Sequence, residues 1–396
     1  MTPLRRRAEE LVRSELQRAP HLYVGGLDVA SDSQLTLTQA NPANGAPVGR
    51  VPEATARDVH GAAKAALRAY QDGQVHDHPS ERAQLLWSFA EALENESEDL
   101  WLLESLQTGH PFAGVKAHTL SEAVRSVRHL ASWAHKLEGR SHVVGPGRTG
   151  RSLEGGVPVF ASSFDTRAPL GTAISKTACA LAVGSSIILH PPATAPSSTM
   201  RIAHLLHELG LAPGRVNVVT GGTKTAERLA AEKLVDAMSF SGDMESARRA
   251  LVGSAISNLK PIHFELGCKT ACILFEDGDA RRAADAVVDH LFSCRYAQFE
   301  TPTRFLIHEE QYADVAANVV ARAKSAVRGD PLDPHTQLGP LCSAKHLERV
   351  LAYVELGRRE GAKLVAGGRQ DAEGHRGRGK VLPPTVLKDP PATLRV

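Results

Sequence analysis

The feature of the sequence that most constrains the fold is a regular alternation of strand-like and helix-like segments between residues 157 and 242. Short apolar runs such as GVPVFASSF and SSIILHPP alternate with helical patterns such as TAISKTACALAVG and SSTMRIAHLLHELGL. Helices of this length between strands predict right-handed crossovers, which bring the strands side by side in a mainly parallel sheet. The segment therefore predicts an α/β fold.

A second series of strands and helices begins near KPIHFELG. It contains the strand-like CILFED and RFLIHE and the helix-like ARRAADAVVDHLFSC and QYADVAANVVARAKSAV. Before the first series, residues 141–156 are rich in glycine and polar side chains, which predicts an exposed hairpin or arm. We therefore expect two sheet-containing lobes with a boundary close to residue 262.

Composition excludes several classes of protein. The chain has 396 residues, enough for two domains, and its 46 basic and 44 acidic residues give a net charge of +2, which offers no electrostatic case for nucleic acid or an anionic membrane. The opening MTPLRRRAEELVRSEL predicts an amphipathic helix, not a secretion signal, and ACALAVGSSIIL is too short to span a bilayer. Neither cysteine nor histidine spacing predicts a metal site. The odd number and scattered positions of the five cysteines predict free thiols in a reducing cytoplasm and argue against a disulfide framework. They are Cys179, Cys268, Cys272, Cys294 and Cys342.

Several motifs together resemble the aldehyde dehydrogenase superfamily. They are RAPLGTAISKTACALAVGSSIILHPPATAPSS, SFSGDMESARR, FELGCKTACILFEDGD and GDPLDPHTQLGPL, and the likeness extends from about residue 22 onward. The resemblance implies a Rossmann-like NAD(P)-binding-type domain, an arm that pairs with another subunit, and a catalytic-type α/β domain. The NAD(P)-binding-type domain would comprise residues 1–140 and 157–262. The arm would comprise residues 141–156, and the catalytic-type domain residues 263–396.

The catalytic positions follow from the same resemblance. The family oxidises aldehydes through a cysteine thiolate, with a glutamate as general base and an asparagine that stabilises the oxyanion. Glu265 in FELGCK matches the base. Counting 34 residues forward from Glu265 and five back from Arg304 gives Phe299 as the nucleophile position, which therefore lacks a nucleophile. Arg167, nine residues before Lys176, stands at the oxyanion position.

Two thiols remain near these positions. Cys294 lies five residues before Phe299, and Cys268 follows Glu265 in the glutamate motif. Free cysteines commonly fill cores as inert side chains, and we expect this of both. The alternative is a relocated thiol or esterase-type chemistry in which one of them acts with Glu265.

The cofactor positions are also altered. The resemblance implies NAD or NADP, with Lys176 matching a family lysine. His190 and Ala193 replace a lysine and a glutamate at the adenosine ribose. Gly242 is retained, whereas Ala247 stands where the family often has the second glycine of its phosphate turn. An added Cβ there crowds a pyrophosphate at a helix N-terminus, so these changes predict weak cofactor binding or none.

The sequence stops at ATLRV, before the segment in which the family carries a Glu-Glu-Ile-Phe-Gly-Pro motif and a C-terminal oligomerisation strand. We therefore expect an incomplete catalytic-type domain. The expected function is that of an inactive family member, a binding, scaffolding or regulatory subunit in a homo- or hetero-oligomer with an aldehyde dehydrogenase. The alternatives are aldehyde oxidation with NAD(P)+, altered thiol chemistry, and a decayed remnant that folds marginally.

Overall fold

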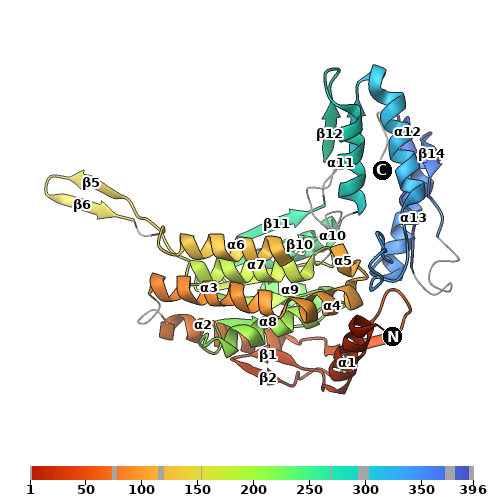
Figure 1. Cartoon of the computed structure of the whole chain (residues 1–396). Helices are drawn as coiled ribbons and strands as arrows, with labels where there is room; N and C mark the ends of the chain where they lie inside the picture. Colours follow the sequence, from red (N-terminus) through yellow and green to blue (C-terminus); the bar gives the residue numbers. More distant parts are fainter. Residues whose placement is uncertain are drawn as a thin grey trace.

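The computed structural model is built around a seven-stranded sheet with the order β11-β10-β7-β8-β9-β1-β2 (Figure 1). It describes residues 2–73, 78–114, 120–152, 154–267, 270–292, 303–370 and 380–391, and side chains in these ranges except 289–292. Five neighbouring strands of the sheet run parallel: β7 (Val159–Ser163), β8 (Ser186–His190), β9 (Val216–Val218), β10 (Ala237–Gly242) and β11 (Ile262–Leu266). The predicted α/β fold with a parallel sheet is confirmed.

The two edge strands come from the N-terminal part of the chain. β1 (Leu22–Val24) pairs antiparallel with β9, and β2 (Leu27–Val29) pairs antiparallel with β1. The central strand β8, SIILH, is buried at every position, as expected for a parallel strand covered on both faces. The continuous apolar run in the sequence thus gives the centre of the sheet.

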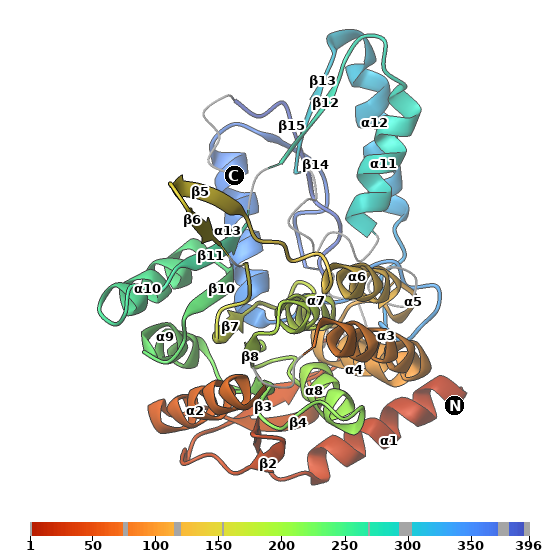
Figure 2. The same cartoon turned by 90° about the vertical axis from the view of Figure 1, so that its left-hand side faces the viewer.

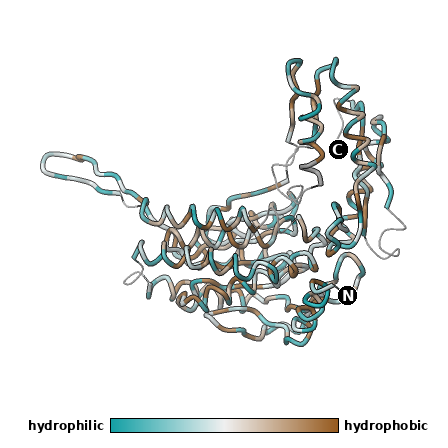
Figure 3. Tube along the Cα trace, viewed as in Figure 1, coloured by the Kyte–Doolittle hydropathy of each residue, from teal (hydrophilic) through white to brown (hydrophobic). Residues whose placement is uncertain are grey.

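Helices cover both faces of this sheet (Figure 2). One face packs its apolar core against α3 (Pro79–Asn95), α4 (Ser97–Thr108), α6 (Leu120–Trp133), α7 (Pro169–Ala182) and α8 (Ser197–Glu208). The other face packs against α2 (Ala56–Gly73), α9 (Thr223–Ala231) and α10 (Met244–Ala255). In Figure 3 hydrophobic positions gather where the helices face the sheet, so burial of apolar area holds the three layers together.

The predicted N-terminal amphipathic helix is α1 (Pro3–Gln17), which begins at the N-cap Thr2. Its Ala8 packs with Leu102 and Leu106 of α4 in a small separate core. Beside it lies the antiparallel hairpin of β3 (Thr36–Ala40) and β4 (Pro47–Pro52). Helix α1 therefore bridges α4 and this hairpin.

Residues 141–156 contain the antiparallel strands β5 (Ser141–Gly145) and β6 (Arg148–Arg151). This hairpin projects away from the body of the molecule (Figure 1), and Val143 is 85% exposed. A two-stranded hairpin alone in water is marginally stable, so its exposed valines favour a partner surface.

The second lobe begins after β11. Its parallel strands β12 (Ala271–Leu274) and β13 (Arg304–Ile307) accompany the helices α11 (Ala280–Phe292) and α12 (Glu309–Ser325). Further elements are α5 (Phe112–Gly114), α13 (Ala344–Arg359), β14 (Lys363–Ala366) and β15 (Val386–Lys388). β11 is an edge strand of the large sheet and begins at Ile262. The expected boundary near residue 262 therefore coincides with the start of this strand, and the division into domains stays a proposal.

Candidate active site

The carboxyl ends of the five parallel strands lie along one side of the sheet, which is called the sheet edge below. Ligands of open α/β sheets bind outside the carboxyl ends of the strands. Ser163 and His190 end β7 and β8 in register with each other. Ser241 of β10 lies in register with Glu265 of β11. The topology alone therefore brings together four polar side chains from distant parts of the sequence.

Glu265 is engaged through both carboxylate oxygens. Ser241 Oγ donates to its Oε2 at 2.8 Å, and Lys176 Nζ of α7 donates to its Oε1. His263 Nε2 lies 3.9 Å from Oε1, but that imidazole is 75% exposed. The structure thus places the expected base and the expected lysine, Lys176, in direct contact.

These contacts change the basicity of the carboxylate. Burial opposes ionisation of Glu265, but the hydrogen bonds from Lys176 and Ser241 outweigh it, so the pKa of Glu265 lies below its usual value. A general base works best when its pKa is near the operating pH. Glu265 is therefore a weak base that already has partners.

Arg167 is held by a residue of its own loop. Its backbone N–H donates to Asp165 Oδ1 at 3.1 Å, and its Nε donates to Asp165 Oδ2 at 2.7 Å. The guanidinium reaches toward the end of β11, where a Cβ added to Gly267 would lie 3.8 Å from Arg167 NH1. The residue at the expected oxyanion position therefore lies near Gly267, two residues after the expected base, and forms an ion pair with Asp165.

His190 is turned inward. Its Nε2 lies 3.1 Å from the carbonyl oxygen of Gly221, and its Nδ1 lies 2.9 Å from Ser163 Oγ. Burial lowers the pKa of His190 to about 4, so the ring is neutral. Because a carbonyl only accepts, Nε2 carries the proton and Ser163 donates to Nδ1. Both ring nitrogens are occupied within the protein.

Two helix N-termini at this edge carry carboxylates. Asp243 caps α10 by accepting from Ser246 N at 3.0 Å, and Glu53 accepts from Gly222 N, the N-cap of α9, at 3.0 Å. Helix N-termini are natural phosphate sites because of their free N–H groups and positive dipole ends. Asp and Glu side chains fill these two positions with negative charge.

Sequence reasoning missed these two carboxylates for different reasons. Asp243 follows a strand and precedes Ser246 by three residues, an N-cap pattern that was available. Glu53 lies far from α9 in the sequence, and only the fold brings it there. Gly242 ends β10 as expected, and Ala247 is buried between α10 and the sheet, 3% exposed.

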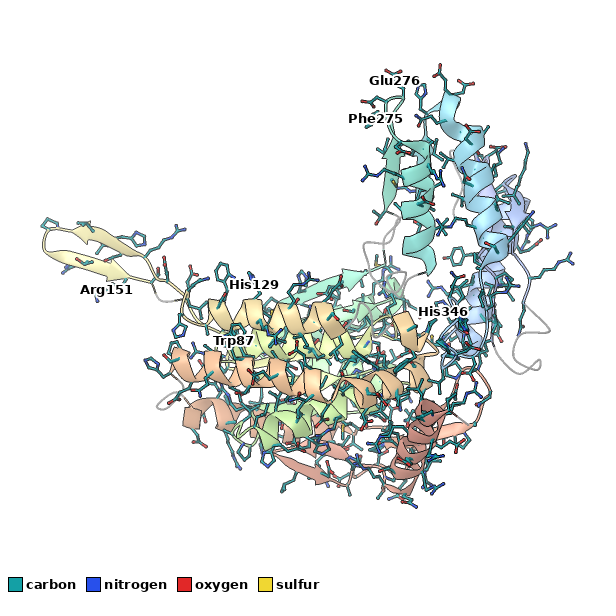
Figure 4. All side chains as sticks on the ribbon, in the orientation of Figure 1. Trp87, His129, Arg151, Phe275, Glu276 and His346 are labelled. Carbon is teal, nitrogen blue, oxygen red and sulfur yellow. The ribbon has the colours of Figure 1, made fainter. Side chains whose placement is uncertain are left out.

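Helix α13 and the residues just before it bring two further groups to this region, and no local pattern in the sequence predicts their place. Cys342 Sγ lies 3.3 Å from Thr166 Oγ1, next to Arg167 in the sequence. His346, labelled in Figure 4, follows on α13. Burial lowers the pKa of His346, and the nearby positive charge of Arg349 lowers it further, so the neutral form of this ring is favoured beside the 165–167 loop.

Three expected site residues, Phe299, Cys268 and Cys294, lie outside the residues that the structure describes. Within the described ranges, no group of three or more His, Cys, Asp or Glu side chains could hold a metal ion. Among the helices that can be described, none is long and apolar enough to cross a membrane.

Comparison with known proteins decides the family. The model of the Aldehyde dehydrogenase family matches residues 29–396. The chain belongs to the aldehyde dehydrogenase family. It is 30% identical over 370 residues to DhaS of Bacillus subtilis (strain 168), covering 93% of this chain and 74% of DhaS.

Solved structures of family members have the same fold. The NAD+ complex of an aldehyde dehydrogenase from Bacillus cereus is 28% identical with a TM-score of 0.91, covering 97% of this chain and 78% of that one. PnpE from Pseudomonas sp. WBC-3 is 32% identical with a TM-score of 0.91, covering 96% and 77%. The resemblance seen in the motifs is therefore confirmed.

Proposed function

We propose that this aldehyde dehydrogenase family member is catalytically inactive and acts as a binding, scaffolding or regulatory subunit. The observation that carries the proposal is the internal pairing of the site: Glu265 with Lys176 and Ser241, and Arg167 with Asp165. Phe299 at the nucleophile position supports it, since a phenyl ring cannot form the covalent intermediate.

The groups at the sheet edge also do not fit a dinucleotide. A pyrophosphate approaching α10 or α9 would meet the carboxylates of Asp243 and Glu53. The ribose position has the inward-facing His190 and the short side chain of Ala193. We therefore propose that NAD and NADP bind weakly or not at all.

The test of this proposal is a calorimetric titration of the full chain with NAD+ and with NADP+. We expect no saturation up to about 1 mM, which would mean that the binding free energy is weaker than about −4 kcal/mol. The matched variant Asp243→Asn keeps a capping oxygen and removes the charge. Any gain in its affinity for NAD+ or NADP+ therefore measures the repulsion between the Asp243 carboxylate and the pyrophosphate. Micromolar binding by the unchanged chain would contradict the proposal.

The second candidate is oxidation of aldehydes with NAD(P)+, which family membership and the likeness to an enzyme solved with NAD+ favour. Its test is reduction of NAD(P)+ by a panel of aldehydes, and turnover at an ordinary rate of about 1–1,000 per second would establish it. Altered thiol chemistry at Cys268 or Cys294 is tested by iodoacetamide labelling. Specific protection of one thiol by an aldehyde or acyl ester would support it.

We further propose that the protein acts in the cytoplasm, in a homo- or hetero-oligomer with an aldehyde dehydrogenase family member, through the hairpin of residues 141–156. The exposed Val143 and Val144 support this, since they project from an isolated pair of strands. The double variant Val143→Ser/Val144→Ser should lower the assembled mass measured by light scattering. An unchanged mass would remove the hairpin from the interface.

A further inference from the structure

A groove lies between α1 and the turn that joins β3 to β4. Its volume is about 550 Å³, within the range of small-molecule sites. Its lining combines one stripe of α1 with the facing turn: Arg5, Ala8, Glu9, Val12, Arg13 and Leu16 on the helix, and Asn41, Ala43, Asn44, Ala46, Pro47 and Val48 opposite. The groove is thus built from two elements that pack beside each other.

The deeper part of the groove is apolar. Ala8 and Val12 of α1, Leu106 of α4 and Leu332 lie along it, and the same side chains belong to the small core under α1. Ala8 is 3% exposed and Leu106 is 6% exposed, so this floor is anchored to the body of the protein. An apolar group of a ligand would be desolvated here.

Two opposite charges, both exposed to solvent, flank this floor. Glu9 and Arg13 lie one helical turn apart on the same face of α1, and neither charged group makes a hydrogen bond or ion pair with another residue in the described ranges. By contrast, Arg5 at the end of the groove is held by Asp330 at 2.8 Å. The charges that a ligand could reach are therefore one anion and one cation.

The facing turn supplies further donors. Asn41 Oδ1 accepts from Ala43 N and Asn44 Oδ1 accepts from Ala46 N, each at 2.9 Å. With both oxygens used to hold the turn, the amide Nδ2 groups are the free parts of these side chains within the described structure. Both asparagines line the groove opposite α1. Donors therefore outnumber acceptors on the side that an anionic group would face.

We propose that this groove binds a free α-amino acid with an apolar side chain. Its ammonium pairs with Glu9, and its carboxylate accepts from Arg13 and from the Asn41 or Asn44 amide. Its side chain lies on the apolar floor near Val12. A simple carboxylate would leave Glu9 unpaired beside it, and a simple amine would leave Arg13 unpaired, so the charges select the zwitterion.

The experiment is calorimetric titration of the full chain with L-phenylalanine, 3-phenylpropanoate and 2-phenylethylamine. For a ligand of this size we expect a dissociation constant of about 1 mM for phenylalanine, and at least about fivefold weaker binding of the two singly charged analogues. Glu9→Gln and Arg13→Gln should each weaken phenylalanine binding about fivefold. Glu9→Gln should also reduce the preference for phenylalanine over 3-phenylpropanoate, and Arg13→Gln should reduce the preference for phenylalanine over 2-phenylethylamine.

Ala46→Trp is the occlusion variant, since Ala46 is an exposed lining residue and the indole fills the groove without entering the core. It should abolish binding while circular dichroism and the thermal transition stay unchanged. The proposal is overturned if phenylalanine does not bind at about 20 mM, if Ala46→Trp binds it as tightly as the unchanged chain, or if either analogue binds equally well.

Discussion

Glu104 of α4 is a buried carboxyl group that joins two helix N-termini. It is 1% exposed, and its Oε1 accepts from Leu170 N at the start of α7 at 3.3 Å. Its Oε2 accepts from Ser198 Oγ at the start of α8, also at 3.3 Å. Burial is the largest influence and raises the pKa of Glu104 from 4.5 to about 7, against the lowering effect of both hydrogen bonds.

This pKa has a consequence for stability with a definite sign. The folded protein holds the proton on Glu104 more tightly than the unfolded chain does, so protonation favours folding. That contribution is complete below about pH 4.5 and is lost as the pH rises toward the folded value of about 7. The difference between 4.5 and about 7 corresponds to about 3 kcal/mol of unfolding free energy, taken as an upper bound.

The variant Glu104→Gln isolates this effect. The amide keeps an acceptor for Leu170 N and can donate to the Ser198 hydroxyl, but it cannot ionise. Urea unfolding of both proteins between about pH 5 and pH 9 should show similar stability at the acid end. At the alkaline end the variant should be more stable by up to about 3 kcal/mol.

Other titrating groups cancel in this comparison. The buried His110, whose pKa burial lowers to about 4, is present in both proteins and contributes equally to each. A stability difference that is the same at every pH would refute the reasoning, because it would show that Glu104 does not change its protonation between the folded and unfolded states in this range.

Three further outcomes are expected. Phe299→Cys should not restore aldehyde oxidation, measured as NADH absorbance, because Glu265 keeps its internal partners. Lys260→Met should lower the free energy of unfolding in urea by about 1–3 kcal/mol, since the buried ammonium donates to the Ala230 carbonyl near the end of α9. Asp243→Ala should lower the free energy of unfolding in urea by about 1 kcal/mol, because α10 loses its N-cap. An unchanged midpoint of urea unfolding would show that the cap is dispensable.

Much of the fold was predictable because the parallel strands carry their signal locally. SIILH contains the apolar run Ile187–Leu189 and forms the fully buried β8, with helical patterns on either side that form α7 and α8. By contrast, β1 and β2 are three residues each, and nothing local indicates that β1 pairs with Val218 of β9. Short edge strands depend on contacts that the sequence does not display.

The candidate site also has features that the sequence predicts and features that it does not. The family resemblance singled out Lys176 and Glu265, and the structure brings these two side chains into direct contact. Spacing gave no information on side-chain direction, so the inward turn of His190 toward Ser163 was not predictable. The carboxylate of Glu53 at α9 was also not predictable, because it depends on a contact between distant segments.

Two altered residues of the site, Arg167 and His190, have hydrogen-bond partners within the protein, which bears on whether the site is decayed or intact. Loss of function without compensation leaves buried polar groups without partners, each costing about 1–3 kcal/mol. Here Arg167 comes with Asp165, and His190 comes with Ser163. This pairing favours a stable non-catalytic protein over a remnant that folds marginally.

The pairing can be measured with a double-mutant cycle. Arg167→Asn alone leaves the Asp165 carboxylate, which is 31% exposed, without its guanidinium, and should lower the free energy of unfolding by about 1 kcal/mol after allowing for solvent. Adding Asp165→Asn should recover most of that loss, because the two changes act on one interaction. If the two single changes simply add, the ion pair does not stabilise the loop, and the altered site would be better described as tolerated damage than as a repaired structure.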